Sequence, residues 1–340
     1  MSKPKRVTIY DVAREAKVSP STVSRAFSNP GRVSADTSAH IFDVARKLGF
    51  HTVGASYSDQ REENRTLAFV LADLSNPVYA SMLAGFQSTA TKNNYSVIIL
   101  NSQENEALER RSVMHILDTV DGIALAASRL SPASILKIEK TRPLVLLHRY
   151  SEGHTCVVPD TSHGIGQICE HLASLGHRKL TYLSGPELSW ANAMRWRAAQ
   201  AKTVEAGITL IRTQNYTPDF DGGQRAADEW FTNPTSAVLA YNDLMACGFM
   251  KAAANKGFNI PRDVSVIGID NSITCTIAEP ELSSLSSGSY EIGEQAALSL
   301  IWQADNRSRR DRRVITVPTD FVQRQSTGPR AQVPLESRML

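Results

Sequence analysis

The chain has 340 residues, a length that fits two or three domains at roughly 100 to 200 residues each. Hydrophobic residues make up 42% and charged residues 21%, which excludes a disordered chain, a collagen and a disulfide-stapled miniprotein. The net charge of +3 is unevenly distributed, because the first 50 residues hold nine Lys/Arg and four Asp/Glu while the other 290 hold 28 basic and 30 acidic groups. A basic amino-terminal module on a near-neutral body indicates a polyanion partner for the first part only.

Cysteine spacing and apolar patterning give no sign of a cofactor, a metal site or a membrane partner. The cysteines Cys156, Cys169, Cys247 and Cys275 form no C-x-x-C pair and have no histidine at ligand spacing. The amino terminus lacks the apolar core of a signal peptide. The longest apolar runs, such as 144–147, are far shorter than the roughly 20 residues that span a bilayer. We therefore expect a cytoplasmic protein with no cofactor.

Capping residues predict three short helices in the first fifty residues. Thr8 with Asp11 three residues later forms a capping-box pattern, and Ser19 and Ser34 are N-cap residues before the other two helical patterns. Pro20 suits the first helical position, where its missing N–H would have had no partner. The predicted helices cover residues 9–16, 20–27 and 34–48.

The first two predicted helices form a helix-turn-helix pattern. The second has Val23, Ala26 and Phe27 on its inner face, which leaves small polar groups and Arg25 outside. In this motif the amino-terminal part of the second helix enters the major groove of DNA. A three-helix bundle with a solvated polar face is the alternative, and the basic charge of this segment favours DNA binding.

Long motifs in this segment resemble the headpiece of the LacI/GalR family of transcriptional regulators. The matching segments are VTIYDVA at 7–13, VSPSTVSRAF at 18–27, VS at 33–34 and LGF at 48–50. The resemblance implies an all-α helix-turn-helix headpiece followed by an α/β two-lobed periplasmic-binding-protein-like core with two parallel sheets. It also implies double-stranded operator DNA and a small-molecule effector as partners, and repression as the commoner mode of action.

The same resemblance assigns DNA-binding residues by position. Pro20, Ser21 and Arg25 fall where family members read base edges, and Arg25 is the strongest candidate because its fork can bond O6 and N7 of a guanine. Ser19 lies beside them at the helix N-cap. The positions where members hold phosphates are Thr8, Tyr10, Thr22, Ser24, Asn29 and Ser34. Phosphate contacts fix register without reading sequence, and helix capping is the alternative role for each hydroxyl.

The segment after the headpiece departs from the family pattern. Thr52 and Val53 replace the usual Pro-Asn pair, and Asp59 stands where members have a leucine that inserts into the minor groove. An acid cannot act as an apolar wedge, and it repels phosphates, as Glu62 and Glu63 also do. We therefore expect no leucine wedge. Either Tyr57 or Val53 takes over part of the minor-groove contact, or residues 54–65 are a simple linker.

From residue 66 onward, short apolar runs alternate with helical patterns, which indicates β-α-β units and parallel sheets covered on both faces. The first set of predicted strands covers 66–72, 96–101, 122–126 and 144–148, and the second covers 179–185, 210–213, 237–241 and 265–270. Helices are predicted between the second set over 163–175, 191–206 and 243–256. A late helix over 290–304 and a strand over 314–318 are expected to return to the first half. Two such halves predict two lobes joined by a hinge, with a ligand between them at the carboxyl ends of the strands.

Polar residues follow several of these strands and resemble the family's effector pocket. Arg195 matches its pocket arginine and Asp270 its ligand-binding aspartate, and such a pair can grip vicinal hydroxyls. Tyr79 matches a wall of the pocket, where an aromatic face stacks on sugar rings or bases. The full set of ligand-binding candidates is Asn76, Tyr79, His148, Trp190, Arg195, Phe220, Asn242 and Asp270. We expect a sugar, a nucleoside or a related polyol.

Three of these candidates have a second interpretation. For Trp190 and Phe220, packing or loop cover is favoured over stacking on a ligand. His148 replaces a common family aspartate, so it either faces the ligand or stacks between the lobes.

The resemblance also implies a homodimer, in which two headpieces read half-sites about one helical turn apart. Apolar faces on the helices after Tyr79 (Met82, Phe86, Ala90) and from Asp243 (Met245, Phe249, Ala252, Ala253) are mostly core, with part of this surface shared in the dimer. The tail 327–340 lacks heptads, which disfavours a coiled-coil tetramer. The arginines at 307, 309, 310, 312 and 313 favour a solvated loop over a DNA contact.

Two other classes of function were weighed. An enzyme is not expected, because the sequence has no G-x-S-x-G elbow, no P-loop and no H-E-x-x-H motif. A two-lobed solute-binding protein without a DNA role is disfavoured by the helix-turn-helix pattern. The predicted domains are a DNA-binding domain (1–58), a linker or atypical hinge (59–65), an effector-binding and dimerisation domain (66–330) and a tail (331–340). Within the effector domain, lobe 1 covers about 66–160 and 289–318, and lobe 2 about 161–288 and 319–330.

Overall fold

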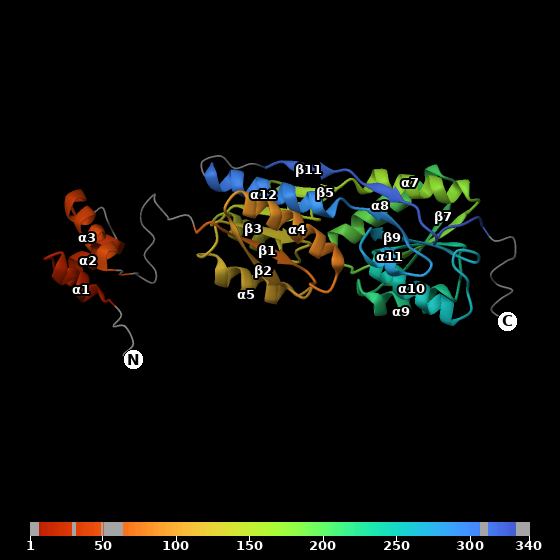
Figure 1. Cartoon of the computed structure of the whole chain (residues 1–340), viewed down its shortest axis with the longest axis horizontal. Helices are drawn as coiled ribbons and strands as arrows, with labels where there is room; N and C mark the ends of the chain where they lie inside the picture. The colour runs from red at the N-terminus through yellow and green to blue at the C-terminus, as the bar shows by residue number, and fades with distance from the viewer. Residues whose placement is uncertain (1–6, 29–31, 49, 51–63, 307–311, 331–340) are drawn as a thin grey trace. The chain divides into compact units, whose positions relative to one another are not determined.

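The computed structural model describes residues 7–28, 32–48, 50, 64–306 and 312–330, and the chain forms two compact units, Met1–Glu63 and Asn64–Leu340 (Figure 1). Several predictions therefore lie outside the described residues. These concern Asn29, the hinge residues Thr52, Val53, Tyr57, Asp59, Glu62 and Glu63, the arginines at 307, 309 and 310, and the tail 331–340.

The first unit contains the three predicted helices, α1 (Ile9–Glu15), α2 (Pro20–Ser28) and α3 (Ala35–Leu48). Their inner faces form one small core, which includes Val12, Val23, Ala26 and Ile41, all fully buried. Lys17 has a positive φ of 56° in the four-residue turn between α1 and α2, which lets the chain change direction sharply there. The helix-turn-helix geometry thus follows from two short amphipathic helices that share one core.

Lobe 1 is built on a six-stranded sheet with the order β11-β5-β4-β3-β1-β2, in which every pair is parallel. Its strands are β1 (Thr66–Leu71), β2 (Ser96–Asn101), β3 (Gly122–Ala126), β4 (Leu144–Leu147), β5 (Thr155–Pro159) and β11 (Val314–Val317). The helices α4 (Pro77–Lys92) and α12 (Ser289–Asp305) pack on one face, and α5 (Glu106–Ile116) and α6 (Pro132–Glu139) on the other. Both faces of the sheet are therefore buried, which explains why β1, β3 and β4 read as continuous apolar runs.

Lobe 2 repeats this architecture with the order β12-β10-β9-β8-β6-β7, in which only β12 is antiparallel to its neighbour. Its strands are β6 (Lys179–Ser184), β7 (Thr209–Asn215), β8 (Ala237–Ala240), β9 (Ser265–Asp270), β10 (Ser283–Ser286) and β12 (Asp320–Val322). The helices α7 (Thr161–Ser174) and α8 (Trp190–Glu205) cover one face, α9 (Phe220–Trp230) and α10 (Asp243–Asn255) the other, and a short α11 (Thr274–Ile277) follows β9. The predicted fold class, a helical headpiece before an α/β two-lobed core, is confirmed.

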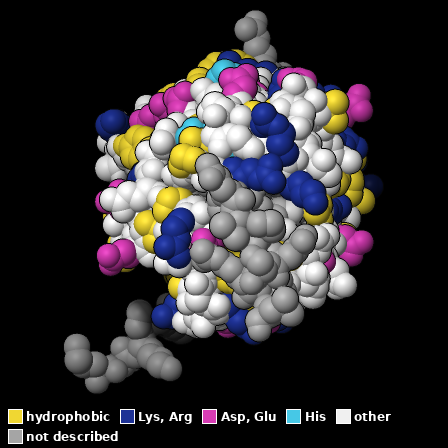
Figure 2. All heavy atoms as spheres, turned by 90° about the vertical axis from the view of Figure 1, so that its right-hand side faces the viewer, with side chains coloured by type: hydrophobic (Ala, Val, Ile, Leu, Met, Phe, Trp, Pro, Cys, Tyr) yellow, Lys and Arg dark blue, Asp and Glu magenta, His cyan; other side chains and the backbone are white. Residues whose placement is uncertain are grey.

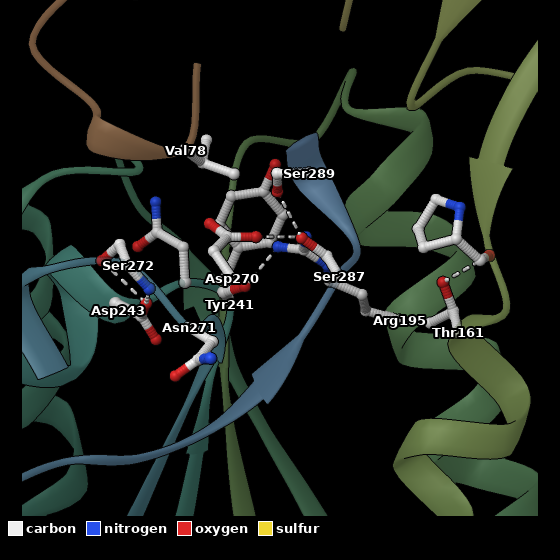
Figure 3. Close-up of polar contacts among 12 residues, drawn as sticks. Val78, Thr161, Arg195, Tyr241, Asp243, Asp270, Asn271, Ser272, Ser287 and Ser289 are labelled. Carbon is white, nitrogen blue, oxygen red and sulfur yellow. Dashed lines mark hydrogen bonds and ion pairs between the residues drawn. The ribbon is translucent and has the colours of Figure 1, made fainter. Parts of the chain in front are cut away.

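The chain passes between the lobes three times, at residues 159–161, 287–289 and 317–320. Hydrogen bonds join two of these crossings, because Asp160 N donates to Val317 O over 2.8 Å and Thr319 Oγ1 donates to Asp160 O over 2.8 Å. In the third, the Ser287 and Ser289 hydroxyls lie 2.8 Å apart (Figure 3). Gly288 between them has a φ of +62°, a conformation that glycine adopts without strain. Three short segments of the chain thus connect the two lobes.

Although residues 51–340 are nearly neutral overall, basic side chains gather on one part of their surface (Figure 2). Figure 2 shows the end of lobe 2 that lies farthest from lobe 1, and several Lys and Arg side chains gather on it. No helix in the described part of the chain is long and apolar enough to cross a membrane.

Replacing Gly293 with alanine is expected to destabilise lobe 1. A Cβ at this position in α12 would lie 1.9 Å from the Met82 carbonyl oxygen of α4, so the two helix backbones would have to separate. Overpacking of this kind costs roughly 1–3 kcal/mol, and more where backbone must move. Urea unfolding measures the loss. The matched control is Gly166→Ala in α7, whose added Cβ would make an ordinary contact with Lys202 at 3.5 Å and which should leave stability unchanged or raise it.

Candidate DNA-binding face and effector site

The headpiece presents the predicted base-reading residues together on the outer face of α2. Pro20, Ser21 and Arg25 are exposed, whereas Val23 and Ala26 of the same helix are buried. One side of α2 thus supplies the core and the other is free to meet a partner.

The predicted hydroxyl groups serve first as helix caps. Ser19 Oγ accepts a hydrogen bond from the backbone N–H of Thr22 over 3.1 Å, and Ser34 Oγ accepts one from Thr37 over 3.3 Å. The backbone N–H of Thr8 donates to the Asp11 carboxylate over 2.9 Å. Ser19 Oγ also lies 2.7 Å from the Thr22 hydroxyl. The remaining predicted phosphate contacts that the structure describes, Tyr10 and Ser24, are exposed.

Several basic residues of the headpiece are neutralised within it. Arg14 pairs with Asp11, and Arg46 and Lys47 pair with Asp43, whose pKa is lowered by the hydrogen bonds from Lys47 and Arg46. Within the described part of the headpiece, Arg25 has no acidic partner. Its charge is therefore available to an external anion.

Arg195 in α8 and Asp270 at the end of β9 form an ion pair in lobe 2 (Figure 3). Arg195 Nη2 donates to Asp270 Oδ1 over 3.1 Å, and Nη1 donates to the Tyr241 carbonyl oxygen. The guanidinium also stacks on the Tyr241 ring, 4.6 Å from its centroid. Both charged side chains are about 95% buried, and they lie at the carboxyl end of β9.

Burial dominates the electrostatics of this pair. It raises the pKa of Asp270 to about 7, with a further contribution from the Asp243 carboxylate and with Arg195 acting in the opposite direction. Burial also opposes the charge of Arg195, but Asp270 holds the pKa of Arg195 above its usual value. Asp243 is itself anchored, since it accepts hydrogen bonds from Ser272 N over 2.7 Å and from Ser284 Oγ over 2.6 Å. Asp270 adopts a φ of +119°, so its orientation is fixed at the expense of backbone strain.

Two predicted residues of lobe 1 face this pair. His148, the residue after β4, is buried close enough to Arg195 for the guanidinium to lower the pKa of the imidazole. Tyr79 in α4 is buried close enough to Tyr241 and Asp270 for both to raise its pKa further above the value that burial alone produces. The first turn of α4, where Val78 is drawn, lies next to Tyr241 and Asp270 in Figure 3. Tyr79, His148, Arg195 and Asp270 thus meet where the lobes face each other.

Two further predicted residues cap helices with their side chains. Asn76 Oδ1 accepts from Val78 N over 3.1 Å at the start of α4. Asn242 Oδ1 accepts from Met245 N over 2.9 Å at the start of α10, and its amide donates to Pro218 O over 2.8 Å. Both side chains are buried. Asn76 lies three residues before Tyr79 and Asn242 directly follows Tyr241, so these caps position the segments that carry the two tyrosines.

The two aromatic candidates differ in their surroundings. Trp190 begins α8 of lobe 2 but packs against the apolar cluster of lobe 1, so it bridges the lobes. Phe220 begins α9 with 40% of its surface exposed, and no described contact joins it to the Arg195–Asp270 pair.

Sequence reasoning missed Tyr241 and a second ion pair. Arg129 follows β3 and bonds the Glu104 carboxylate through Nη2 over 2.6 Å and through Nε over 2.7 Å. The charge of Glu104 raises the pKa of Tyr79 and the charge of Arg129 lowers it, while Tyr241 raises the pKa of Arg129. The rule that polar residues gather at carboxyl ends of strands would have found both, had it been applied to β3 and to the last residue before Asn242.

We expect His148 to make the protein less stable in acid. Burial first and Arg195 second lower its pKa from the usual 6.5 to about 3. The unfolded chain therefore takes up a proton first, and the stability present above pH 6.5 is lost as the pH falls towards 3. At pH 5 this amounts to about 2 kcal/mol. Urea unfolding at pH 7 and pH 5 should show that His148→Phe loses less free energy of unfolding in acid than the wild type does. Equal losses would mean that His148 is not the source of the acid sensitivity.

Both units of the chain are similar in sequence to known bacterial regulatory proteins. Residues 8–52 match the family model for bacterial regulatory proteins of the lacI family, and residues 169–327 match a periplasmic binding protein-like domain. Catabolite control protein A of Priestia megaterium is 28% identical over 333 residues, which cover 94% of this chain and 99% of that protein. The HTH-type transcriptional repressor CytR of Escherichia coli (strain K12) is 29% identical over 307 residues, covering 87% of this chain and 89% of that protein.

Solved structures agree on the fold. A LacI family transcriptional regulator from Enterococcus faecium with bound ribose is 26% identical with a TM-score of 0.70, covering 78% of this chain and 99% of that one. The lac repressor dimer bound to operator, 21% identical, has a TM-score of 0.71 and covers 95% of this chain and 100% of that one.

A helix-turn-helix unit followed by a two-lobed periplasmic-binding-protein-like body defines a class of bacterial regulatory proteins. Within that class, this chain belongs to the LacI/GalR family of transcriptional regulators. In the described part of the chain, no group of three His, Cys, Asp or Glu side chains could hold a metal ion.

Proposed function

We propose that the protein is a repressor that binds a pseudo-palindromic operator in double-stranded DNA, and that a small effector held between its lobes controls this binding. The observation that supports this proposal most directly is that one chain carries two features: an exposed Arg25 on α2, which has no acidic partner in the described headpiece, and a buried Arg195–Asp270 pair that faces the other lobe. The first feature suits a phosphate-bearing duplex and the second a small hydrogen-bonding ligand. Such a protein acts in the cytoplasm, where the DNA is.

The proposed effector is a sugar, a nucleoside or a related polyol. Support comes from the residues that meet between the lobes, since an arginine–carboxylate pair grips hydroxyls and Tyr79 can stack on a ring. The similar regulator from Enterococcus faecium has ribose bound, and a structure that shares the fold, of CelR, has cellobiose bound.

The proposed control mechanism uses the three crossings between the lobes. An effector that contacts Tyr79 and His148 on one side and Arg195 and Asp270 on the other favours the closed arrangement of the lobes. Its differential affinity for the closed and open states shifts the equilibrium between them. Closure then alters the placement of the lobes in a dimer, and with it the spacing of the two headpieces.

The proposed dimer uses exposed apolar side chains outside the cores. Met82, Phe86, Met245 and Phe249 are completely buried within the chain, so α4 and α10 can contribute only their outer residues. Large exposed apolar side chains instead lie on the edge strand β2, on α5, in α11 and just before it: Ile99, Met114, Ile277 and Ile273. In Figure 1, α5 of lobe 1 and α10 of lobe 2 lie along the same side of the body.

Placing a charge on this surface should separate the dimer. Ile99 is 45% exposed on β2, so Ile99→Asp should leave the fold intact and weaken dimerisation at least tenfold in sedimentation-velocity measurements. The matched control is Val204→Asp, because Val204 is 79% exposed on α8 and lies outside the proposed interface. Unchanged association of the Ile99 variant would place the interface elsewhere.

The proposed function is tested with an operator selected from a random DNA library. Affinity should fall steeply with salt, since phosphate contacts release counterions, and an effector should change it at fixed salt. Failure to select any DNA at low salt would contradict a regulatory role.

A further inference from the structure

The imidazole of His148 carries a buried polar atom that has no partner in the described part of the chain. Nε2 is fully buried and forms no hydrogen bond with any described residue, and the residue as a whole is only 6% exposed. His148 also has a φ of +53°, an uncommon conformation for a side chain of its size. A buried polar atom without a partner is destabilising, and such atoms persist where a ligand supplies the missing bond.

His148 lies in lobe 1 close to the charged pair of lobe 2. The residue directly follows the carboxyl end of β4 in lobe 1, and the charge of Arg195 in lobe 2 lowers the pKa of its imidazole. The backbone N–H of His148 is already bonded to Val157 O over 3.1 Å, so the side chain alone remains to be satisfied.

The cations at this interface are already neutralised. Arg195 and Arg129 are the arginines that act on His148 and Tyr79, and each has a carboxylate of its own, Asp270 at 3.1 Å and Glu104 at 2.6 Å. Burial together with Arg195 keeps the imidazole of His148 neutral at physiological pH. Transferring an anionic ligand into such a site would leave a buried charge without a counterion, which is strongly unfavourable.

We propose that the effector is an uncharged molecule with a hydroxyl group that hydrogen-bonds Nε2 of His148, and that phosphorylated or carboxylated analogues are excluded. This inference rests on the function proposed above and narrows its ligand class. A hydroxyl fits either tautomer of the imidazole because it both donates and accepts, whereas phosphate and carboxylate oxygens only accept. Asp270 and Glu104 add to the exclusion, since each would repel an anion at close range.

The first test compares matched neutral and phosphorylated probes on the full chain. The pairs are ribose with ribose 5-phosphate, glucose with glucose 6-phosphate, and adenosine with adenosine monophosphate, measured by thermal shift and calorimetry. We expect the neutral member of at least one pair to bind, and its phosphate to bind at least 100-fold more weakly. A phosphate that binds as tightly as its neutral partner, or binding by no member of any pair, would overturn the proposal.

The second test removes the polar atom and keeps the ring. His148→Phe should raise the melting temperature of the free protein, because an unsatisfied buried atom is lost, and should weaken the neutral probe at least tenfold. The matched control is Ser299→Ala in α12, which also removes a buried atom that has no partner among the described residues but lies in the helix interior of lobe 1. It should leave probe affinity unchanged.

The outcomes separate this inference from the function on which it rests. If operator binding responds to a phosphorylated probe, the proposed regulatory function stands, but the inference that the effector is uncharged is wrong. Loss of probe affinity in both variants to the same degree would mean that His148 acts only through stability. A chain that selects no operator contradicts the proposed function itself, whatever probes it binds.

Discussion

Arg195→Ala is expected to abolish the effector response and to lower the free energy of unfolding by about 3–5 kcal/mol. The substitution leaves the Asp270 carboxylate buried with no cation, and removes the donor that holds the Tyr241 carbonyl oxygen. Because burial already raises the pKa of Asp270 to about 7, the orphaned carboxyl can take up a proton. A raised pKa in the folded state means that stability is lost as the pH rises through it, so the variant should be weaker at pH 8 than at pH 6.

The double variant Arg195→Met, Asp270→Asn separates stability from recognition. It removes both charges and keeps similar volumes, so we expect most of the lost stability to return, while the effector response stays absent. Urea unfolding and operator titration with and without effector measure the two properties. Both variants should bind operator DNA without effector. A double variant that still responds to effector would remove the pair from the binding site.

Much of the fold could be predicted because the periodicities were strong. The helices of the headpiece and the strands β1, β3 and β4 agree with their predicted ranges to within one residue or two. The strands β5, β10 and β12 were not predicted. β10 reads Ser-Ser-Leu-Ser, a polar pattern that forms a buried strand only because Asp243, Ser326 and Thr327 satisfy its hydroxyl and N–H groups. Such partners come from distant parts of the chain and have no local signature.

The site was harder to predict because caps and ligand-binding residues occupy the same places. In a parallel α/β lobe, the end of a strand and the start of the next helix meet at one edge, so a polar residue such as Asn76 or Asn242, which caps a helix there, has the same sequence pattern as a ligand-binding residue. Arg195 and Asp270 were predicted by position in the family, but their contact spans 75 residues. The Glu104–Arg129 pair depends on a left-handed loop at Glu104, with a φ of +56°, which apolar patterning cannot reveal.

The second large effect concerns DNA. Arg25→Ala should reduce affinity for a selected operator roughly 10- to 100-fold, since one bidentate contact to a guanine is worth about 1–3 kcal/mol of discrimination. Arg25 is exposed on α2 and has no acidic partner in the described headpiece, so its removal should leave the helical core of Val12, Val23 and Ile41 intact. Circular dichroism of the variant checks the fold.

Arg25→Lys distinguishes reading a base from holding a phosphate. Lysine keeps the charge but loses the planar fork, so the salt dependence of binding should stay close to wild type while discrimination between the operator and its guanine-substituted variants falls. Affinity for random DNA should change little in either variant, because the bonds that Arg25 makes to a base are absent there. If Arg25→Ala instead weakens operator and random DNA equally, and the salt slope drops by about one, Arg25 binds a phosphate and the sequence is read by its neighbours on α2.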